Sequence, residues 1–143
     1  MILVDVNLLV YATNKSADQH TAAFIWFSHQ LSGPARVGLP WHTLLGFLRI
    51  ATSSRAFVRA LPMTTAWRQI EDWLNCDPVW IPQPTERHAE TLGMLLSQPG
   101  VRGNLVSDAH LAALAIEHGL TLCSTDGDFA RFRSLKWENP LAA

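Results

Sequence analysis

Cysteine, lysine and long apolar runs are all scarce in this chain of 143 residues. Its two cysteines, Cys76 and Cys123, show no CxxC or other ligand spacing, so we expect reduced, buried thiols. The six histidines form no HExxH or Cys/His pattern, which argues against a zinc site. No apolar run approaches the roughly 20 residues of a membrane span, and no basic leader opens the chain. We therefore expect a soluble, cytoplasmic protein without a membrane partner.

The charge of the chain is nearly balanced, at a formal −1. This balance argues against a generic binder of polyanions. Lys15 and Lys136 are the only lysines, whereas arginines number nine, and arginine binds phosphate in a bidentate manner better than lysine does. With 48% hydrophobic residues, a chain of this length forms one core, so we expect a single domain over residues 1–143.

Apolar periodicity predicts strands and helices in a largely alternating order, with an extra helical pair in the middle. The pattern favours an α/β fold, with a central, mostly parallel sheet flanked by helices on both sides. A loop is expected at residues 99–103, and Gly119 is expected to end the last helix. The predicted strands are 2–4, 35–39, 79–81 and 120–124, and the predicted helices are 5–12, 17–31, 40–53, 64–75, 85–97 and 104–118.

Four aspartates stand where strands end or a helix begins. Asp5 follows the first strand, and Asp126 and Asp128 follow the last one, so parallel pairing would bring these acids to one edge of the sheet. Asp108 is placed by the pattern in the first turn of the helix 104–118, where the helix dipole favours a carboxylate. Taken singly, each acid is compatible with a cap or a turn. Gathered together they repel one another unless a cation such as Mg²⁺ or Mn²⁺ binds.

Large aromatic side chains are numerous on the predicted helices. Each is either a core residue, which we favour for any single one, or part of a partner surface. The six are Trp26, Phe27, Trp41, Phe47, Trp67 and Trp73.

Four segments resemble the motifs of PIN-domain proteins. Residues 1–12, MILVDVNLLVYA, resemble the family's opening, and residues 47–52, FLRIAT, resemble its second-helix signature. Residues 107–115, SDAHLAALA, and residues 124–132, STDGDFARF, are similar to its C-terminal motifs, as found in toxins of the VapC type. The resemblance spans nearly the whole chain, and acid, helix, strand and second acid follow in the family's order.

The resemblance implies a metal-dependent endoribonuclease that serves as the toxin of a type II toxin–antitoxin pair and cleaves cellular RNA to arrest translation and growth. By the family's pattern, Asp5, Asp108 and Asp126 would hold Mg²⁺ or Mn²⁺ and Asp128 would assist in catalysis. Asn7 would orient Asp5 by a hydrogen bond, besides its expected role as cap of the first helix.

The resemblance also implies partners. The toxins form homodimers and bind a VapB-type antitoxin in a heterotetramer or larger assembly, with the antitoxin's C-terminal segment across the acidic cleft. An arginine of that segment would take the place of the metal's charge. For RNA contact, the candidates in this chain are Arg49, Arg55, Arg102 and Arg131, with a salt bridge or solvent exposure as the alternative for each.

The chain departs from the family at Gly46, where many members carry a glutamate before the Phe-Leu-Arg signature. Because this carboxylate is missing, a PIN-fold binding module that does not cleave RNA remains an alternative. His42, one helical turn earlier, faces the same cleft or is structural, and we favour the structural role. A haloacid-dehalogenase-like phosphatase is a less favoured alternative, because it needs a second aspartate where Asn7 stands and a lysine in mid-chain, and no lysine lies between Lys15 and Lys136. A receiver domain is disfavoured for similar reasons.

Overall fold

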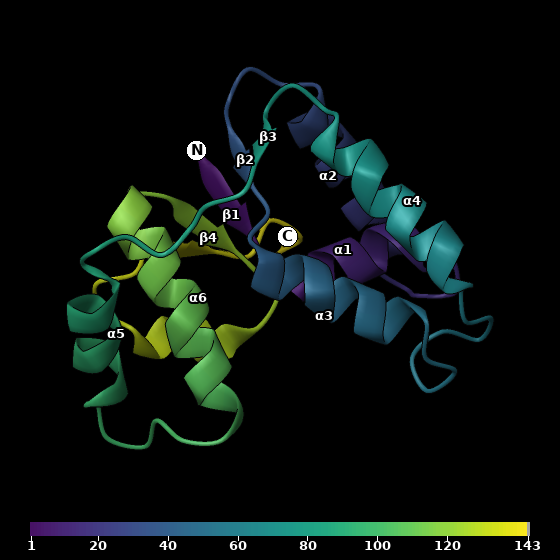
Figure 1. The fold of residues 1–143 in the computed structure, drawn as a ribbon. Coiled ribbons are helices and arrows are strands. Elements are labelled where there is room, and N and C mark those ends of the chain that lie inside the picture. The colour runs from purple at the N-terminus through teal and green to yellow at the C-terminus, as the bar shows by residue number, and fades with distance from the viewer. Residues whose placement is uncertain (143) are drawn as a thin grey trace.

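In the computed structural model, which describes residues 1–142, five short strands form one sheet in the order β3-β2-β1-β4-β5 (Figure 1). Every neighbouring pair runs parallel, which confirms the predicted parallel α/β architecture. The last strand, β5, was not predicted. The strands are β1 (Ile2–Val4), β2 (Val37–Gly38), β3 (Val79–Trp80), β4 (Thr121–Cys123) and β5 (Trp137–Glu138).

All six predicted helices are present in the described residues, and a 3₁₀ helix follows β4. Two helices begin three residues later than predicted, because short turns precede them. His20 N donates to Ala17 O at 3.1 Å before α2, and His88 N donates to Thr85 O at 3.0 Å before α5. The helices are α1 (Val6–Thr13), α2 (His20–Leu31), α3 (Trp41–Ala51), α4 (Met63–Leu74), α5 (His88–Leu96), α6 (Asn104–His118) and the 3₁₀ helix η1 (Gly127–Arg131).

The helices cover both faces of the sheet, with α1 to α4 on one side and α5 with α6 on the other (Figure 1). Successive residues of a strand point to opposite faces, so each central strand supplies both cores. Val4 and Cys123 pack with α1 to α4, whereas Leu3 and Leu122 pack with α5 and α6. Leu3 pairs with Leu122 and Val4 with Cys123 in the register of β1 and β4. This register fixes the neighbouring strand ends, where the acids follow.

The aromatic residues divide between core and surface. Trp73 contacts Phe27 and Phe47 edge to face, with ring centroids 5.5 and 4.9 Å apart, and all three are buried. Trp41 and Trp67 instead stack on each other at 6.4 Å and stay 37% and 41% exposed. The core interpretation is therefore confirmed for Trp73, Phe27 and Phe47, whereas a partner role for the exposed Trp41 and Trp67 stays a prediction.

Both cysteines are free thiols, as predicted, but the expected burial is wrong for Cys76, which is partly exposed. Cys123 is buried on β4, and burial raises the pKa of its thiol to about 12. Such a thiol stays protonated and inert at neutral pH. Among residues 1–142, no helix is long and apolar enough to cross a membrane.

Candidate functional site

Asp5 occupies the junction between β1 and α1. Its backbone N donates to Cys123 O at 3.0 Å, so the backbone pairing of β1 with β4 extends one residue beyond the end of β1. Its side chain caps α1, since Oδ1 accepts from Val6 N at 2.8 Å. Asn7, predicted as this cap, lies inside the helix instead. Asp5 is therefore fixed at the carboxyl edge of the sheet, directly beside the end of β4.

Ser124, a fully buried residue after β4, connects the polar groups of this edge. Its hydroxyl donates to Asp5 Oδ2 at 2.7 Å and accepts from Asp126 N at 3.0 Å and from Asn7 Nδ2 at 3.1 Å. A hydroxyl has one donor and two acceptor sites, so all of its capacity is used. The contact from Asn7 to Asp5 thus runs through Ser124. Sequence reasoning gave Ser124 no role.

Three carboxylates gather next to this junction. Asp108, Asp126 and Asp128 each offer an oxygen, and the three oxygens lie within 4.8 Å of one another. Asp126 caps η1 and accepts from Asp128 N at 2.9 Å, which holds these two acids together. We call these three residues the acidic cluster. It shares Asp108 and Asp126 with the predicted metal ligands and contains Asp128, while Asp5 lies beside it.

The prediction that Asp108 lies in the first turn of its helix is wrong. Because α6 begins at Asn104, Asp108 is its fifth residue, and the first turn carries no acid. The dipole of the helix end is therefore not what favours the carboxylate there, since that effect fades beyond the first turn. Asp108 reaches the site because its position on α6 faces the end of β4, where Asp126 follows.

The carboxylates raise one another's pKa. Burial, together with the charges of Asp126, Asp5 and Asp128, raises the pKa of Asp108 to about 6, against the opposing charge of Arg131. Burial and the charge of Asp126 also raise the pKa of Asp5, although the hydrogen bond from Ser124 acts in the opposite direction. The four acids are thus electrostatically coupled, as the sequence predicted, and the site carries more negative charge than its own groups compensate.

The donor set fits a hard divalent cation. Carboxylate oxygens are the ligands that Mg²⁺ and Mn²⁺ prefer, and the cluster supplies three at short mutual distance. The side-chain oxygen of Asn7 is buried and has no hydrogen-bond partner within residues 1–142, which leaves one further hard oxygen at this edge. A cation here would relieve the repulsion that raises the pKa of Asp108.

Gly46 brings α3 close to α1. A Cβ at this position would lie 3.3 Å from Val6 Cγ2, tighter than ordinary van der Waals contact. At Gly46, where the family resemblance predicts a glutamate, α3 therefore packs against α1 without any side chain. His42, on the same helix, is exposed, and its charge acts on Asp5 to lower the pKa. His42 also packs edge to face against His110, with ring centroids 5.6 Å apart, so its structural role stays a prediction.

Two further histidines form a hydrogen-bonded chain between α5 and α6. Glu117 accepts from Thr85 Oγ1 at 2.6 Å and from His88 Nδ1, and His88 Nε2 faces His110 Nδ1 at 3.1 Å. Burial and the charges of His88 and His42 lower the pKa of His110. Because the carboxylate of Glu117 accepts from His88, the chain fixes how both rings are turned. It ties α5 to the helix that carries Asp108.

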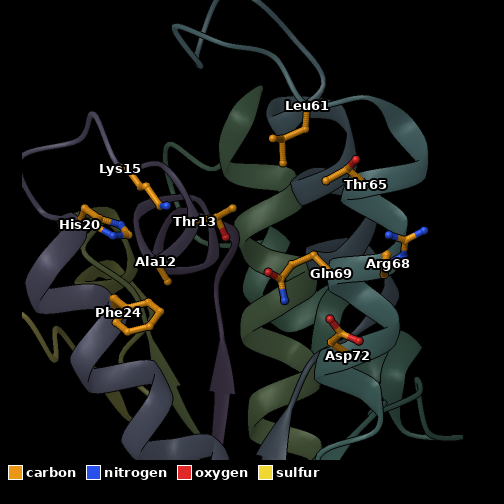
Figure 2. Close-up of a pocket in the computed structure, with 10 residues that line it drawn as sticks. All are labelled: Ala12, Thr13, Lys15, His20, Phe24, Leu61, Thr65, Arg68, Gln69 and Asp72. Carbon is orange, nitrogen blue, oxygen red and sulfur yellow. The ribbon is translucent and has the colours of Figure 1, made fainter.

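A separate cleft of 530 Å³ lies on the other side of the molecule, between the α1–α2 region and α4 (Figure 2). Lys15 and His20 line one wall, and Arg68 and Asp72 line the other. The cleft holds a single carboxylate, so it lacks the means to bind a divalent cation by clustered acids. The acidic cluster, and not this cleft, offers the donor set for such a cation.

Sequence comparison places these features among known proteins. The PIN domain family matches residues 2–135. The chain is 44% identical over 142 residues to Ribonuclease VapC37 of Mycobacterium tuberculosis, covering 99% of each chain. It is 40% identical over 141 residues to Ribonuclease VapC33 of the same species, again covering 99% of each.

Solved structures share the fold at lower identity. VapC20 of Mycobacterium tuberculosis, described as a sarcin-ricin loop cleaving toxin, superposes with a TM-score of 0.69 at 20% identity, covering 93% of this chain and 95% of that one. VapBC-1 of nontypeable Haemophilus influenzae superposes with a TM-score of 0.70 at 19% identity, covering 99% and 100%. The predicted PIN-like fold is confirmed, and the phosphatase and receiver alternatives are set aside.

Proposed function

The chain belongs to the PIN domain family and, within it, to the VapC ribonucleases, and from this premise we propose that it is a Mg²⁺- or Mn²⁺-dependent endoribonuclease. It acts as the toxin of a type II toxin–antitoxin pair in the cytoplasm, where it cleaves cellular RNA and so arrests translation and growth. One observation carries the proposal: the oxygens of Asp108, Asp126 and Asp128 lie within 4.8 Å of one another at the edge of a parallel sheet.

Asp108 and Asp126 would hold the metal together with Asp5, and Asp128 completes the acidic cluster. When bound, the cation lowers the pKa of a water, polarises the scissile phosphate and neutralises charge on the leaving oxygen. Ser124 and Asn7 keep the Asp5 carboxylate in one orientation, through hydrogen bonds of 2.7 and 3.1 Å. A fixed carboxylate needs no reorganisation during the reaction.

Asp128 is an exposed member of the cluster, and we assign to it the proton that the attacking water loses. Its backbone N–H is held by Asp126 at 2.9 Å, so its place in the cluster is set by η1. Asp108 contributes as an anion, because its raised pKa falls once positive charge enters the site. The acids alone would repel RNA, so cleavage requires the cation.

The proposal includes two protein partners. A VapB-type antitoxin places its C-terminal segment across the acidic cleft, where an arginine pairs with the coupled carboxylates and excludes the metal. Two toxin chains associate as a homodimer, and with the antitoxin they form a heterotetramer or a larger assembly. Support comes from the fold shared with VapBC-1 of nontypeable Haemophilus influenzae and from the excess negative charge of the site.

The test compares the wild type with Asp108→Asn and with Asp18→Asn, an exposed aspartate outside the site. Each is induced in a bacterial host, and total RNA is sequenced for new 5′ ends. We expect growth arrest and discrete cuts in the wild type and in Asp18→Asn only. The purified wild type and Asp18→Asn should cut the same RNA with Mg²⁺ and not with EDTA.

Undiminished cleavage by a folded Asp108→Asn variant would contradict the metal-site assignment. If the folded wild type binds RNA and the antitoxin but cuts no RNA with either metal, the loss of a carboxylate at Gly46 has been decisive. The protein would then be a binding module on the same fold.

A further inference from the structure

A second cleft has a volume of 450 Å³. It is lined by Gln98 and Pro99 from the loop after α5, by Arg131 at the end of η1 and by Arg133 two residues later. η1 starts directly after Asp126 and contains Asp128. Two acids of the cluster and the two arginines of the cleft are therefore close neighbours in the sequence.

Neither arginine is engaged by the protein itself. Both side chains are exposed, and the one ion pair among residues 1–142 joins His88 to Glu117. Within the same residues, no hydrogen bond involves either guanidinium. An exposed guanidinium with five N–H donors and no protein acceptor is available to an external anion.

The position of Arg131 is defined on two sides. Its Nη1 atom lies 3.6 Å from the point where a Cβ on Gly100 would stand, so the side chain runs across this glycine in the loop before α6. On the other side, its positive charge acts on Asp108 and opposes the rise of that carboxyl's pKa. Arg131 thus lines the cleft and lies within electrostatic reach of Asp108.

A polyanion is the ligand that such an arrangement fits. A nuclease with four coupled carboxylates repels every phosphate of the strand except the one that faces the metal, and the chain's formal charge of −1 offers no general attraction. Guanidinium groups bind phosphate oxygens through paired N–H donors. Two of them, a few residues after the acids, offset the repulsion where the strand passes the cluster.

We propose that Arg131 and Arg133 form a phosphate-binding subsite, which holds the RNA backbone next to the scissile bond. The inference rests on the proposed ribonuclease function. Of the arginines singled out from the sequence, Arg131 is the one whose charge acts on Asp108. Arg133 lines the same cleft as Arg131. The two residues position the strand and do not touch the reacting phosphate, so they act on binding more than on the chemical step.

The test measures RNA binding by the full-length protein in an Asp108→Asn background, so that the probe is not cut. The probe is a fluorescein-labelled single-stranded RNA of mixed sequence, followed by fluorescence anisotropy with Mg²⁺ over a series of salt concentrations. The double variant Arg131→Gln/Arg133→Gln is compared with Arg59→Gln/Arg87→Gln, which removes the same charge at exposed arginines away from the cleft.

We expect the subsite variant to bind RNA about tenfold more weakly at low salt, and its plot of log K against log salt to be shallower by about 1.4, because two phosphate contacts are lost. The control should keep the parent's affinity and slope. Equal affinity and slope in all three proteins would overturn the proposal. A variant that loses only its affinity for the antitoxin would overturn it too, since the arginines would then bind acidic groups of a protein.

Cleavage assays separate this inference from the function on which it rests. The same arginine variants, with Asp108 intact, are assayed for cleavage with Mg²⁺ below saturating RNA. If the wild type cuts RNA and the arginine variant matches it in KM and in RNA affinity, only the subsite fails. If no protein cuts RNA, yet the subsite variant still loses RNA affinity and salt dependence, the nuclease function fails and the subsite stands.

Discussion

Ser124 decides how the acids at the junction of β1 and β4 are held. It is fully buried and uses its hydroxyl for three hydrogen bonds, to Asp5, Asn7 and the backbone of Asp126. An alanine in its place would leave these groups without partners in a region closed to water. A buried polar group left unsatisfied costs about 1–3 kcal/mol.

We predict that Ser124→Ala lowers the free energy of unfolding by about 1–3 kcal/mol and reduces RNA cleavage, because Asp5 loses its orientation. Urea unfolding and cleavage with Mg²⁺ measure the two effects. Ser134→Ala is the control, since this serine is exposed and forms no hydrogen bond within residues 1–142. Equal stability and activity of the two variants would refute the role given to Ser124.

A second prediction concerns the pH dependence of stability. In the folded protein without metal, the pKa of Asp108 is raised from 3.8 to about 6. The folded state therefore binds this proton more tightly than the unfolded chain does, and the contribution of Asp108 to stability falls as pH rises from 3.8 to about 6. The Asp108→Asn variant does not lose stability in this way, because its side chain stays neutral at every pH.

In EDTA, the melting temperature of Asp108→Asn should exceed that of the wild type by more at about pH 7.5 than at about pH 4.5. Added Mg²⁺ should raise the melting temperature of the wild type at the higher pH and have little effect on the variant, because a ligand that binds the folded state stabilises it. A difference between the two proteins that does not change with pH would contradict the coupling of the four acids.

The acids of the site were predictable from the sequence because strand ends and a parallel sheet bring Asp5 and Asp126 to one edge. Ser124 was not predicted, because only the three-dimensional contacts reveal its three hydrogen bonds. Its signal in the sequence is a hydroxyl directly after the apolar pair Leu122-Cys123. The sequence also did not predict that Asp128, and not Asp5, joins Asp108 and Asp126 in the acidic cluster. This grouping depends on the turn of η1.

At the scale of single elements, Gly38 and Gly93 allow the same substitution to be compared in a strand and in a helix. Gly38 lies on β2, and a Cβ there would stand 2.8 Å from Pro82 Cγ and 3.2 Å from Ile2 O. Gly93 lies inside α5, where a Cβ would meet nothing within 4 Å. The same substitution therefore has opposite consequences at the two sites.

We predict that Gly38→Ala destabilises the protein by about 1–3 kcal/mol, because the added methyl forces the proline and the strand apart. Gly93→Ala should stabilise it by up to about 1 kcal/mol, because alanine favours the helix. Urea unfolding of the two variants and the wild type provides the measurement. A destabilised Gly93→Ala, or a Gly38→Ala as stable as the wild type, would show that the packing around β2 or α5 differs from this description.

Helices were easier to predict from the sequence than the outer strands. The helices have apolar faces that repeat at helical spacing, whereas β2, β3 and β5 are two residues long. β5, Trp137–Glu138, has no apolar run at all, and its place is fixed by distant partners. Ser124 N donates to Glu138 O at 3.0 Å, and Trp137 Nε1 donates to Ser124 O at 3.1 Å. Local sequence propensity does not reveal contacts of this kind between separate segments.

At the scale of the whole molecule, α3 and α4 expose an apolar surface among residues 1–142. Trp41 and Trp67 stack on each other there, and Leu45 and Met63 extend the surface one helical turn along each helix, with exposures of 57% and 55%. We call these four residues the α3–α4 patch. Contiguous exposed apolar groups of this kind are typical of protein interfaces.

We predict that the α3–α4 patch forms the homodimer contact and that Leu45→Glu shifts the protein from dimer to monomer. Light scattering after size exclusion distinguishes the 15.9 kDa chain from a species of twice that mass. Val58→Glu is the control, since Val58 is 83% exposed in the loop after α3. A wild-type monomer, or a Leu45→Glu variant that remains dimeric, would place self-association elsewhere or rule it out.

The strand order has a consequence for when the acidic cluster is assembled during synthesis. β1 lies between β2 and β4, so it pairs with a strand that the ribosome makes after β2, β3 and the helices α1 to α6. A ribosome extends the chain at about 5–20 residues per second, N-terminus first. Until β4 and η1 emerge, Asp5 lacks Ser124 and Asp108 lacks Asp126. A nascent chain that ends before η1 therefore has no assembled acidic cluster.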